Sequence, residues 1–149
     1  MVTYIPTEYL GSFKEQVVPM LDKAAARSNG RFRGSDFWEM VADGTNQLWL
    51  TVDDEENIIG ATTTSIYANR NLSVMEIIAH GGTSLDNTHL SEVMNSLEEF
   101  AVENDCDVIR IVGRHGWKKV LDKYGYKEEH IVLEKELSDE RRRNDERED

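Results

Sequence analysis

The chain has 149 residues, which is enough for one domain of ordinary size. Hydrophobic residues make up 39% of it and charged residues 31%, a balance that supports one core with a well-solvated surface. The formal net charge of −12 repels phosphate backbones and anionic lipid head groups. The composition therefore argues against nucleic acid or a membrane as a partner. It favours plain solvation, a basic protein partner or a cationic amine.

The single cysteine, Cys106, excludes an internal disulfide. It is expected to be a small buried thiol, and the composition suits a reducing cytoplasm. No apolar run approaches the roughly 20 residues that a membrane span needs. Residues 1–6 contain no basic stretch, so we expect no signal peptide.

Two helices are predicted before any strand. Apolar side chains at helical spacing predict the first over about residues 7–28, and Pro19 inside this run predicts a kink or a break. The second is predicted over residues 36–42, because Asp36 and Glu39 have the spacing of a capping box with Asp36 as the N-cap.

Three strands rich in apolar and β-branched residues then follow, at residues 47–52, 58–67 and 72–79. An acidic turn separates the first two, so they are expected to form a hairpin. Gly81 and Gly82 are expected to break the third strand and to begin a turn.

The second half of the chain alternates helices and strands. The apolar stripe of a long helix consists of Leu90, Val93, Met94, Leu97 and Ala101. A strand is predicted at residues 108–112 and a helix at residues 116–124. Gly125 suits the left-handed position that ends a helix, and Tyr126 can fold back as the apolar partner at that end. The last predicted strand covers residues 130–135.

Residues 138–149 contain no apolar side chain. They form either a disordered tail or a solvated helix held by alternating charges. The folded domain is therefore expected to cover residues 1–137. Hairpin strands followed by a β-α-β-α-β alternation predict an α/β domain with a mixed central β-sheet flanked by helices.

This order of elements resembles the GNAT family of acyl-CoA N-acyltransferases, and in particular GNAT-like proteins of tailed bacteriophages and prophages. The segments that carry the resemblance are QLWL (47–50), IIGA (58–61), GG (81–82), LEEFA (97–101), GRHGW (113–117), VL (120–121) and YGY (124–126). The resemblance covers roughly residues 47–137 and implies a GNAT-like fold. It also implies acetyl-CoA as a cofactor and no metal.

The resemblance points to Gly81, Gly82, Thr83 and Ser84 as the cofactor-binding residues. In this family the pyrophosphate of acetyl-CoA lies at a helix N-terminus, in a loop whose glycines let backbone N–H groups approach it. Here the glycines are adjacent rather than spaced, and Asp86 adds a negative charge. A capped turn between a strand and a helix explains the same residues.

Glu76 and His80 are the candidates for a catalytic base. The family often uses a Glu on the strand before the cofactor loop, and Glu76 interrupts an apolar run where a carboxylate can take a proton from an ammonium. The alternative is that Glu76 faces solvent or pairs with a Lys or Arg. Leu121 occupies the position of the Tyr that commonly protonates the leaving thiolate in this family.

Arg114, Gly116 and Trp117 form a candidate contact for an anion or a partner. Arg114 precedes a predicted helix start, where backbone N–H groups favour an anion or a carboxylate. Trp117 is either a core anchor or an exposed recognition ring.

These departures from the family pattern favour a GNAT-fold accessory or virion-associated interaction protein with a degenerate acyltransferase site. Its partner would be a phage or host protein, in the bacterial cytoplasm or the virion, and the charged tail would dock to it. The alternative is an acetyl-CoA-dependent N-acetyltransferase acting on an amine, because positioning alone supplies much of an enzyme's rate. The sequence leaves open whether the chain is an enzyme.

Overall fold

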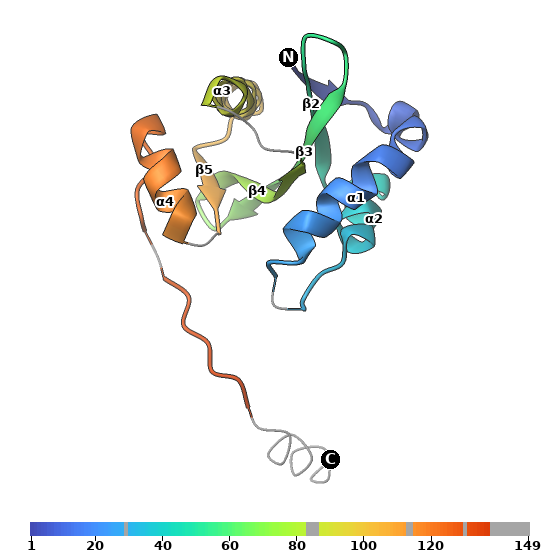
Figure 1. The fold of residues 1–149 in the computed structure, drawn as a ribbon. Helices are drawn as coiled ribbons and strands as arrows, with labels where there is room; N and C mark the ends of the chain where they lie inside the picture. Colours follow the sequence, from blue (N-terminus) through green and yellow to red (C-terminus); the bar gives the residue numbers. More distant parts are fainter. Residues whose placement is uncertain (29, 83–86, 113–114, 130, 138–149) are drawn as a thin grey trace. The chain divides into compact units, whose positions relative to one another are not determined.

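The computed structural model describes residues 1–28, 30–82, 87–112, 115–129 and 131–137. The chain divides into two units, Met1–Gly113 and Arg114–Asp149, and each is described by itself (Figure 1). The predicted domain boundary at residue 137 stays a prediction. The predicted tail at 138–149 lies outside the described residues.

The described strands of the first unit form one five-stranded sheet in chain order. They are β1 (Val2–Ile5), β2 (Gln47–Val52), β3 (Ile58–Asn69), β4 (Leu72–Gly82) and β5 (Val108–Ile111). Neighbouring strands are antiparallel except β4 and β5, which are parallel. The predicted α/β fold with a mixed central sheet is confirmed.

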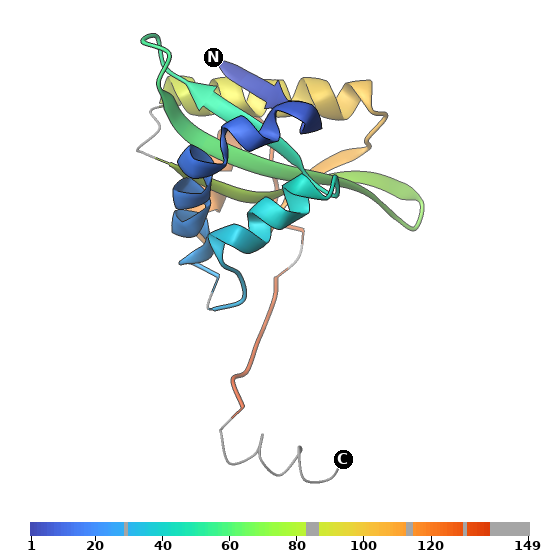
Figure 2. The ribbon, with the colours of Figure 1, turned by 90° about the vertical axis from the view of Figure 1, so that its right-hand side faces the viewer.

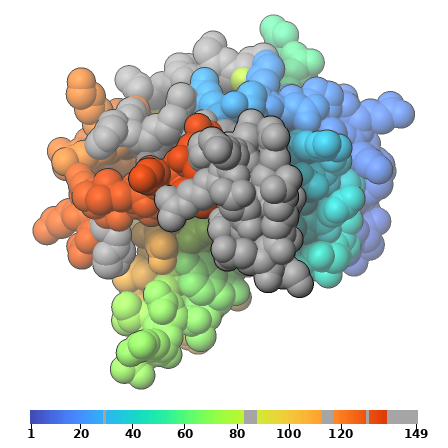
Figure 3. Space-filling model, turned by 90° about the horizontal axis from the view of Figure 1, so that it is seen from below, coloured from blue at the N-terminus to red at the C-terminus, as the bar shows by residue number. Residues whose placement is uncertain are grey.

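Helices cover both faces of this sheet. The helical segments of this unit are the 3₁₀ helix η1 (Thr7–Ser12), α1 (Lys14–Ala25), α2 (Gly34–Ala42) and α3 (Asn87–Glu103). α1 and α2 lie together on one face, and α3 lies on the opposite face (Figures 1 and 2). The turn that joins β3 to β4 projects beyond α1 and α2, as the green segment in Figure 3 shows. Among the described residues, no helix is long and apolar enough to cross a membrane.

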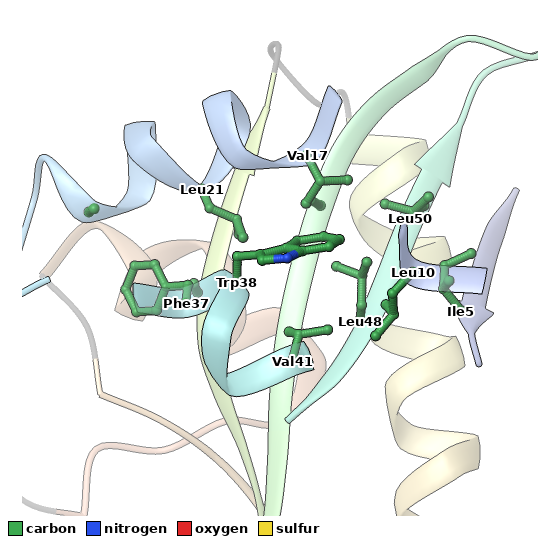
Figure 4. Close-up of a cluster of buried hydrophobic side chains, with 12 residues drawn as sticks. Ile5, Leu10, Val17, Leu21, Phe37, Trp38, Val41, Leu48 and Leu50 are labelled. Carbon is green, nitrogen blue, oxygen red and sulfur yellow. The ribbon is translucent and has the colours of Figure 1, made fainter. Parts of the chain in front are cut away.

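Trp38 lies at the centre of the core between α1, α2 and the sheet (Figure 4). Val17 and Leu21 of α1 pack with it, and so does Leu48 of β2. Burying large apolar side chains of this kind contributes about 1.5–3 kcal/mol each. Side chains alternate along a strand, so the neighbour of Leu48, Trp49, points to the other face.

That other face is held by aromatic contacts with α3. The ring of Phe100 meets that of Trp49 edge-on at 5.0 Å and stacks on Tyr4 at 5.7 Å. The predicted apolar stripe of α3 is confirmed, because its side chains are buried: Leu90, Val93, Met94, Leu97 and Ala101.

The structure corrects the prediction at the N-terminus. Residues 2–5 form an edge strand, which the sequence pattern did not predict, and the helical run breaks at Phe13 rather than at Pro19. Pro19 lies inside α1 and is exposed to solvent. The missing N–H leaves the carbonyl of Glu15 without its helical partner, but on the solvent side water can satisfy it.

The capping prediction for α2 was wrong by one turn. Asp36 is the third helical residue rather than the N-cap, and its carboxylate accepts a hydrogen bond from the backbone N–H of Arg33 at 2.7 Å. The helix begins at Gly34, whose N–H donates to Asp22 of α1 at 2.9 Å. Contact with α1 therefore fixes where α2 starts.

Gly81 and Gly82 were predicted to break this strand, but they are the last two residues of β4. They pair with Ala61 and Gly60 of β3. A Cβ on Gly81 would overlap the backbone carbonyl of Met20 in α1. Gly82 has a φ of +146°, and a Cβ there would overlap the backbone of β3. These glycines allow backbone segments to pack closely.

The second unit contains α4 (His115–Leu121) and the 3₁₀ helix η2 (Asp122–Tyr124). Gly125 has a φ of +88°. Its N–H donates to the carbonyl of Asp122 at 3.1 Å, and the N–H of Tyr126 donates to the carbonyl of Leu121 at 3.3 Å. This is a Schellman motif, so the predicted role of Gly125 is confirmed.

The predicted last strand at 130–135 was wrong. Residues 131–137 form no strand, and Ile131, Val132 and Leu133 are all largely exposed. Apolar and β-branched residues form a strand only where a neighbouring strand and a buried face are available. His130 lies outside the described residues.

The close packing at Gly81 predicts a specific cost. Gly81→Ala should lower the free energy of unfolding by about 1–3 kcal/mol, because the added methyl group has to push α1 away from β4. The matched control is Gly11→Ala, where nothing lies within 4 Å of the added Cβ and the change should stay within about 0.5 kcal/mol. Urea unfolding measures both, and equal stability of the two variants would contradict this account of Gly81.

Candidate functional site

The site is built around the place where β5 stops pairing with β4. Pairing covers Val74 to Ile77 of β4, opposite Val108 to Ile111 of β5. β4 runs on to Gly82, five residues beyond its last pair with β5. Where two parallel strands part in this way, an extended ligand can lie along the longer strand.

A β-bulge lies in the same stretch of β4. Thr63 of β3 pairs with Ala79, but Thr64 pairs with Ile77, so Ile78 is one residue in excess. A bulge shifts the alternation of side chains by one position. The side chains after Ile78 therefore point to the opposite face from the one that they would have in a regular strand.

Because of this bulge, the structure does not bring Glu76 and His80 together. His80 pairs with Thr62 and Glu76 pairs with Ser65, and these two β3 residues are three positions apart. Residues an odd number of positions apart in a strand point to opposite faces. His80 therefore lies on the α3 face, and Glu76 on the face that carries α1 and α2.

Glu76 is held by two neighbouring side chains. The hydroxyl of Tyr67 donates to its Oε1 at 2.8 Å, and Nε of Arg110 lies 3.5 Å from the same oxygen. The side chain of Glu76 is 21% exposed. The structure thus shows the alternative foreseen for Glu76, pairing with an arginine, while its role as a base stays a prediction.

Tyr67 acts as the donor in this cluster. Burial, reinforced by the hydrogen bond and charge of Glu76, raises the pKa of its phenol above the ordinary value, although Arg110 acts in the opposite direction. Tyr67 therefore keeps its proton at neutral pH. It shares that proton with Oε1 of Glu76.

His80 lies in a different environment. Its Nδ1 is 2.8 Å from the hydroxyl of Thr62, and burial lowers its pKa from 6.5 to about 4. The imidazole is therefore neutral at pH 7 and a weak base. Its catalytic role stays a prediction.

The candidate cofactor loop is only partly visible. Thr83 and Ser84 lie outside the described residues. At Gly81 and Gly82, the space that a Cβ would take is filled by the chain's own backbone rather than being open to a ligand. Phosphate binding by these four residues stays a prediction.

The predicted contact around Trp117 belongs to the second unit. Arg114 lies outside the described residues, Gly116 is within α4, and the side chain of Trp117 is half-buried. Lys118 donates to Glu128 at 2.8 Å, an exposed contact that raises the pKa of Lys118. A role of these residues in binding an anion or a partner stays a prediction.

A hollow of about 490 Å³ lies elsewhere in the first unit. It is lined by residues of β1, β2, the start of α1 and the turn before β3, including Thr3, Phe13, Leu50 and Ile58. Neither Glu76 nor His80 lines it.

Comparison with known proteins identifies the architecture. No protein-family model and no curated protein matches the sequence. Among solved structures, a putative acetyl transferase from Pyrococcus furiosus aligns with a TM-score of 0.69 at 16% identity, over 92% of this chain and 100% of its own. A GNAT family acetyltransferase from Staphylococcus aureus aligns with a TM-score of 0.62 at 14% identity, over 92% and 98%.

A predicted acetyltransferase from Clostridium acetobutylicum, determined with acetyl-CoA, aligns with a TM-score of 0.64 at 16% identity, over 92% and 97%. The chain has the GNAT acetyltransferase fold. At this identity the likeness shows the fold alone. The three proteins come from cellular organisms and give no support to a phage origin.

Within this GNAT fold, sequence reasoning missed Tyr67 and Arg110. One signal for Arg110 was present, because Glu76 is the third residue of VMEII (74–78) and Arg110 the third of VIRIV (108–112). Opposite charges at the same place in two apolar runs indicate cross-strand partners, and the register pairs them. Tyr67 has no comparable signal.

The lowered pKa of His80 predicts a dependence of stability on pH. The unfolded chain takes up a proton near pH 6.5, while folded His80 resists it down to about pH 4. The free energy of unfolding should therefore fall below pH 6.5 and level off near pH 4, with His80 contributing up to about 3 kcal/mol. In urea unfolding at a series of pH values, the free energy of unfolding of His80→Asn should fall less over this range. An unchanged decline would show that His80 titrates normally.

Proposed function

We propose that this protein is an acetyl-CoA-dependent N-acetyltransferase that acts on an amine. The observation that carries the proposal is the place beside Glu76 where β4 and β5 part. The last two pairs between β4 and β5 are Glu76 with Arg110 and Ile77 with Ile111. A carboxylate thus lies at the point where two parallel strands part, which is where open α/β sheets commonly bind ligands.

The parting of β4 and β5 fits the cofactor that the fold implies. The pantetheine arm of coenzyme A is extended and carries amide groups, so it can lie along a strand as an added strand does. Residues 78–82 would hold that arm, and Thr83 and Ser84 follow them in the chain. Bound acetyl-CoA supplies an acetyl group activated as a thioester. The Clostridium structure with acetyl-CoA supports this choice of cofactor.

Glu76 is the better candidate for the base. It lies beside the end of β4–β5 pairing, whereas His80 lies on the opposite face and is a weak base. Oε2 of Glu76 has no hydrogen-bond partner among the described residues, so it can accept a proton from an ammonium and leave a nucleophilic lone pair on nitrogen. The acidic composition of the chain favours the approach of a cationic amine.

A second candidate is the accessory or virion-associated interaction protein that the resemblance to phage proteins implies. One observation supports it. Ile131, Val132 and Leu133 form a run of apolar side chains that are each at least 67% exposed. Contiguous exposed apolar side chains commonly mark a surface that binds another protein. We rank this candidate second because it does not account for the carboxylate at the place where β4 and β5 part.

Acetyl-CoA should stabilise the folded protein. At 100 times its dissociation constant it should add about 2.7 kcal/mol to the free energy of unfolding. Adenosine 3′,5′-bisphosphate is the control, because it has no pantetheine arm and cannot pair with β4. Thermal unfolding measures both effects. No shift at millimolar acetyl-CoA would overturn the proposed function and favour the interaction protein.

A further inference from the structure

We infer that Tyr67 and Arg110 are positioning residues, which hold Oε1 of Glu76 and thereby direct its Oε2 toward the acyl acceptor. This inference rests on the proposed function and goes beyond it. It assigns a role to two side chains that come from strands on either side of β4.

The geometry places both donors on one atom. The Tyr67 hydroxyl lies 2.8 Å from Oε1 of Glu76, and Arg110 Nε lies 3.5 Å from the same Oε1. The strand register explains why they meet. Arg110 is the direct neighbour of Glu76 on β5, and Ser65 is the direct neighbour of Glu76 on β3. Tyr67 lies two residues beyond Ser65 and is therefore on the same face.

Holding Oε1 of Glu76 also fixes the direction in which its Oε2 points. The terminal torsion of a glutamate side chain is broad, so an unsupported carboxylate presents either oxygen in many orientations. One hydrogen bond and one ion pair on Oε1 narrow that range, and they leave the lone pairs of Oε2 unused among the described residues. General-base catalysis needs that kind of orientation, because the base has to lie within hydrogen-bond reach of the proton that it removes.

The two donors make different contributions. Tyr67 remains a neutral donor, because the raised pKa of its phenol keeps the proton on its oxygen. Arg110 brings a positive charge 3.5 Å from Oε1, but its side chain is 40% exposed, so solvent weakens the attraction. We therefore expect Tyr67 to contribute more to orientation than Arg110.

The test uses the full chain with Tyr67→Phe and Arg110→Met, each assayed with acetyl-CoA and a panel of primary amines. Tyr67→Phe should lower kcat by about tenfold, which corresponds to one lost hydrogen bond to a charged group. Arg110→Met should lower kcat by less, because its ion pair with Glu76 is partly exposed. The KM for acetyl-CoA should stay unchanged in both variants.

Two controls separate positioning from folding. Tyr9→Phe and Arg70→Met change exposed residues of the same types outside the cluster and should leave kcat unchanged. In a Glu76→Gln background, Tyr67→Phe should cause no further loss, because its effect passes through the carboxylate. A full loss of kcat in that background, or an unchanged kcat in the Tyr67→Phe and Arg110→Met variants, would overturn the inference.

A readout without turnover separates this inference from the proposed function. In ¹³C NMR at pH 7, the chemical shift of the Glu76 carboxyl carbon should change in Tyr67→Phe and Arg110→Met but not in Tyr9→Phe or Arg70→Met. An unchanged chemical shift in the first two variants would refute positioning even if the enzyme is active. If acetyl-CoA neither binds nor reacts while the chemical shift changes as expected, the proposed function fails and the hold on Glu76 stands.

Discussion

The arrangement of the site depends on how β4 is paired. β4 follows β3 along its whole length, from Leu72 to Gly82, but β5 follows β4 only as far as Ile77. The two strands therefore part beside Glu76, and an extended ligand with amide groups can lie along β4 beyond that point. The packing of α1 on Gly81 holds this end of β4 in place from the side.

The bulge at Ile78 then divides the polar side chains of β4 between two environments. Glu76 points to the face of α1 and α2, where a phenol and a guanidinium hold it. His80 points to the face of α3, where burial keeps it neutral. A regular strand would have placed these two side chains on one face, four residues apart. One extra residue thus keeps a charged base and a neutral imidazole apart.

The sequence predicted what depends on periodicity. The apolar stripe of α3, the hairpin of β2 and β3, and the left-handed Gly125 all follow from local patterns. What it missed depends on contacts between distant segments. β1 is a strand because β2 offers it an edge, and α2 starts at Gly34 because Asp22 of α1 meets its N–H. The run of Ile131, Val132 and Leu133 has strand-forming side chains but forms no strand. The sequence offered Glu76 as a candidate base, but the bulge and Tyr67 leave no mark on its local sequence.

The central claim is that the cofactor binds along β4 beyond its last pair with β5, and backbone hydrogen exchange tests it most directly. The account predicts that saturating acetyl-CoA slows the exchange of β4 amides in residues 78–82 and leaves those in residues 74–77 unchanged. No change in residues 78–82, or an equal change along the whole of β4, would contradict the account.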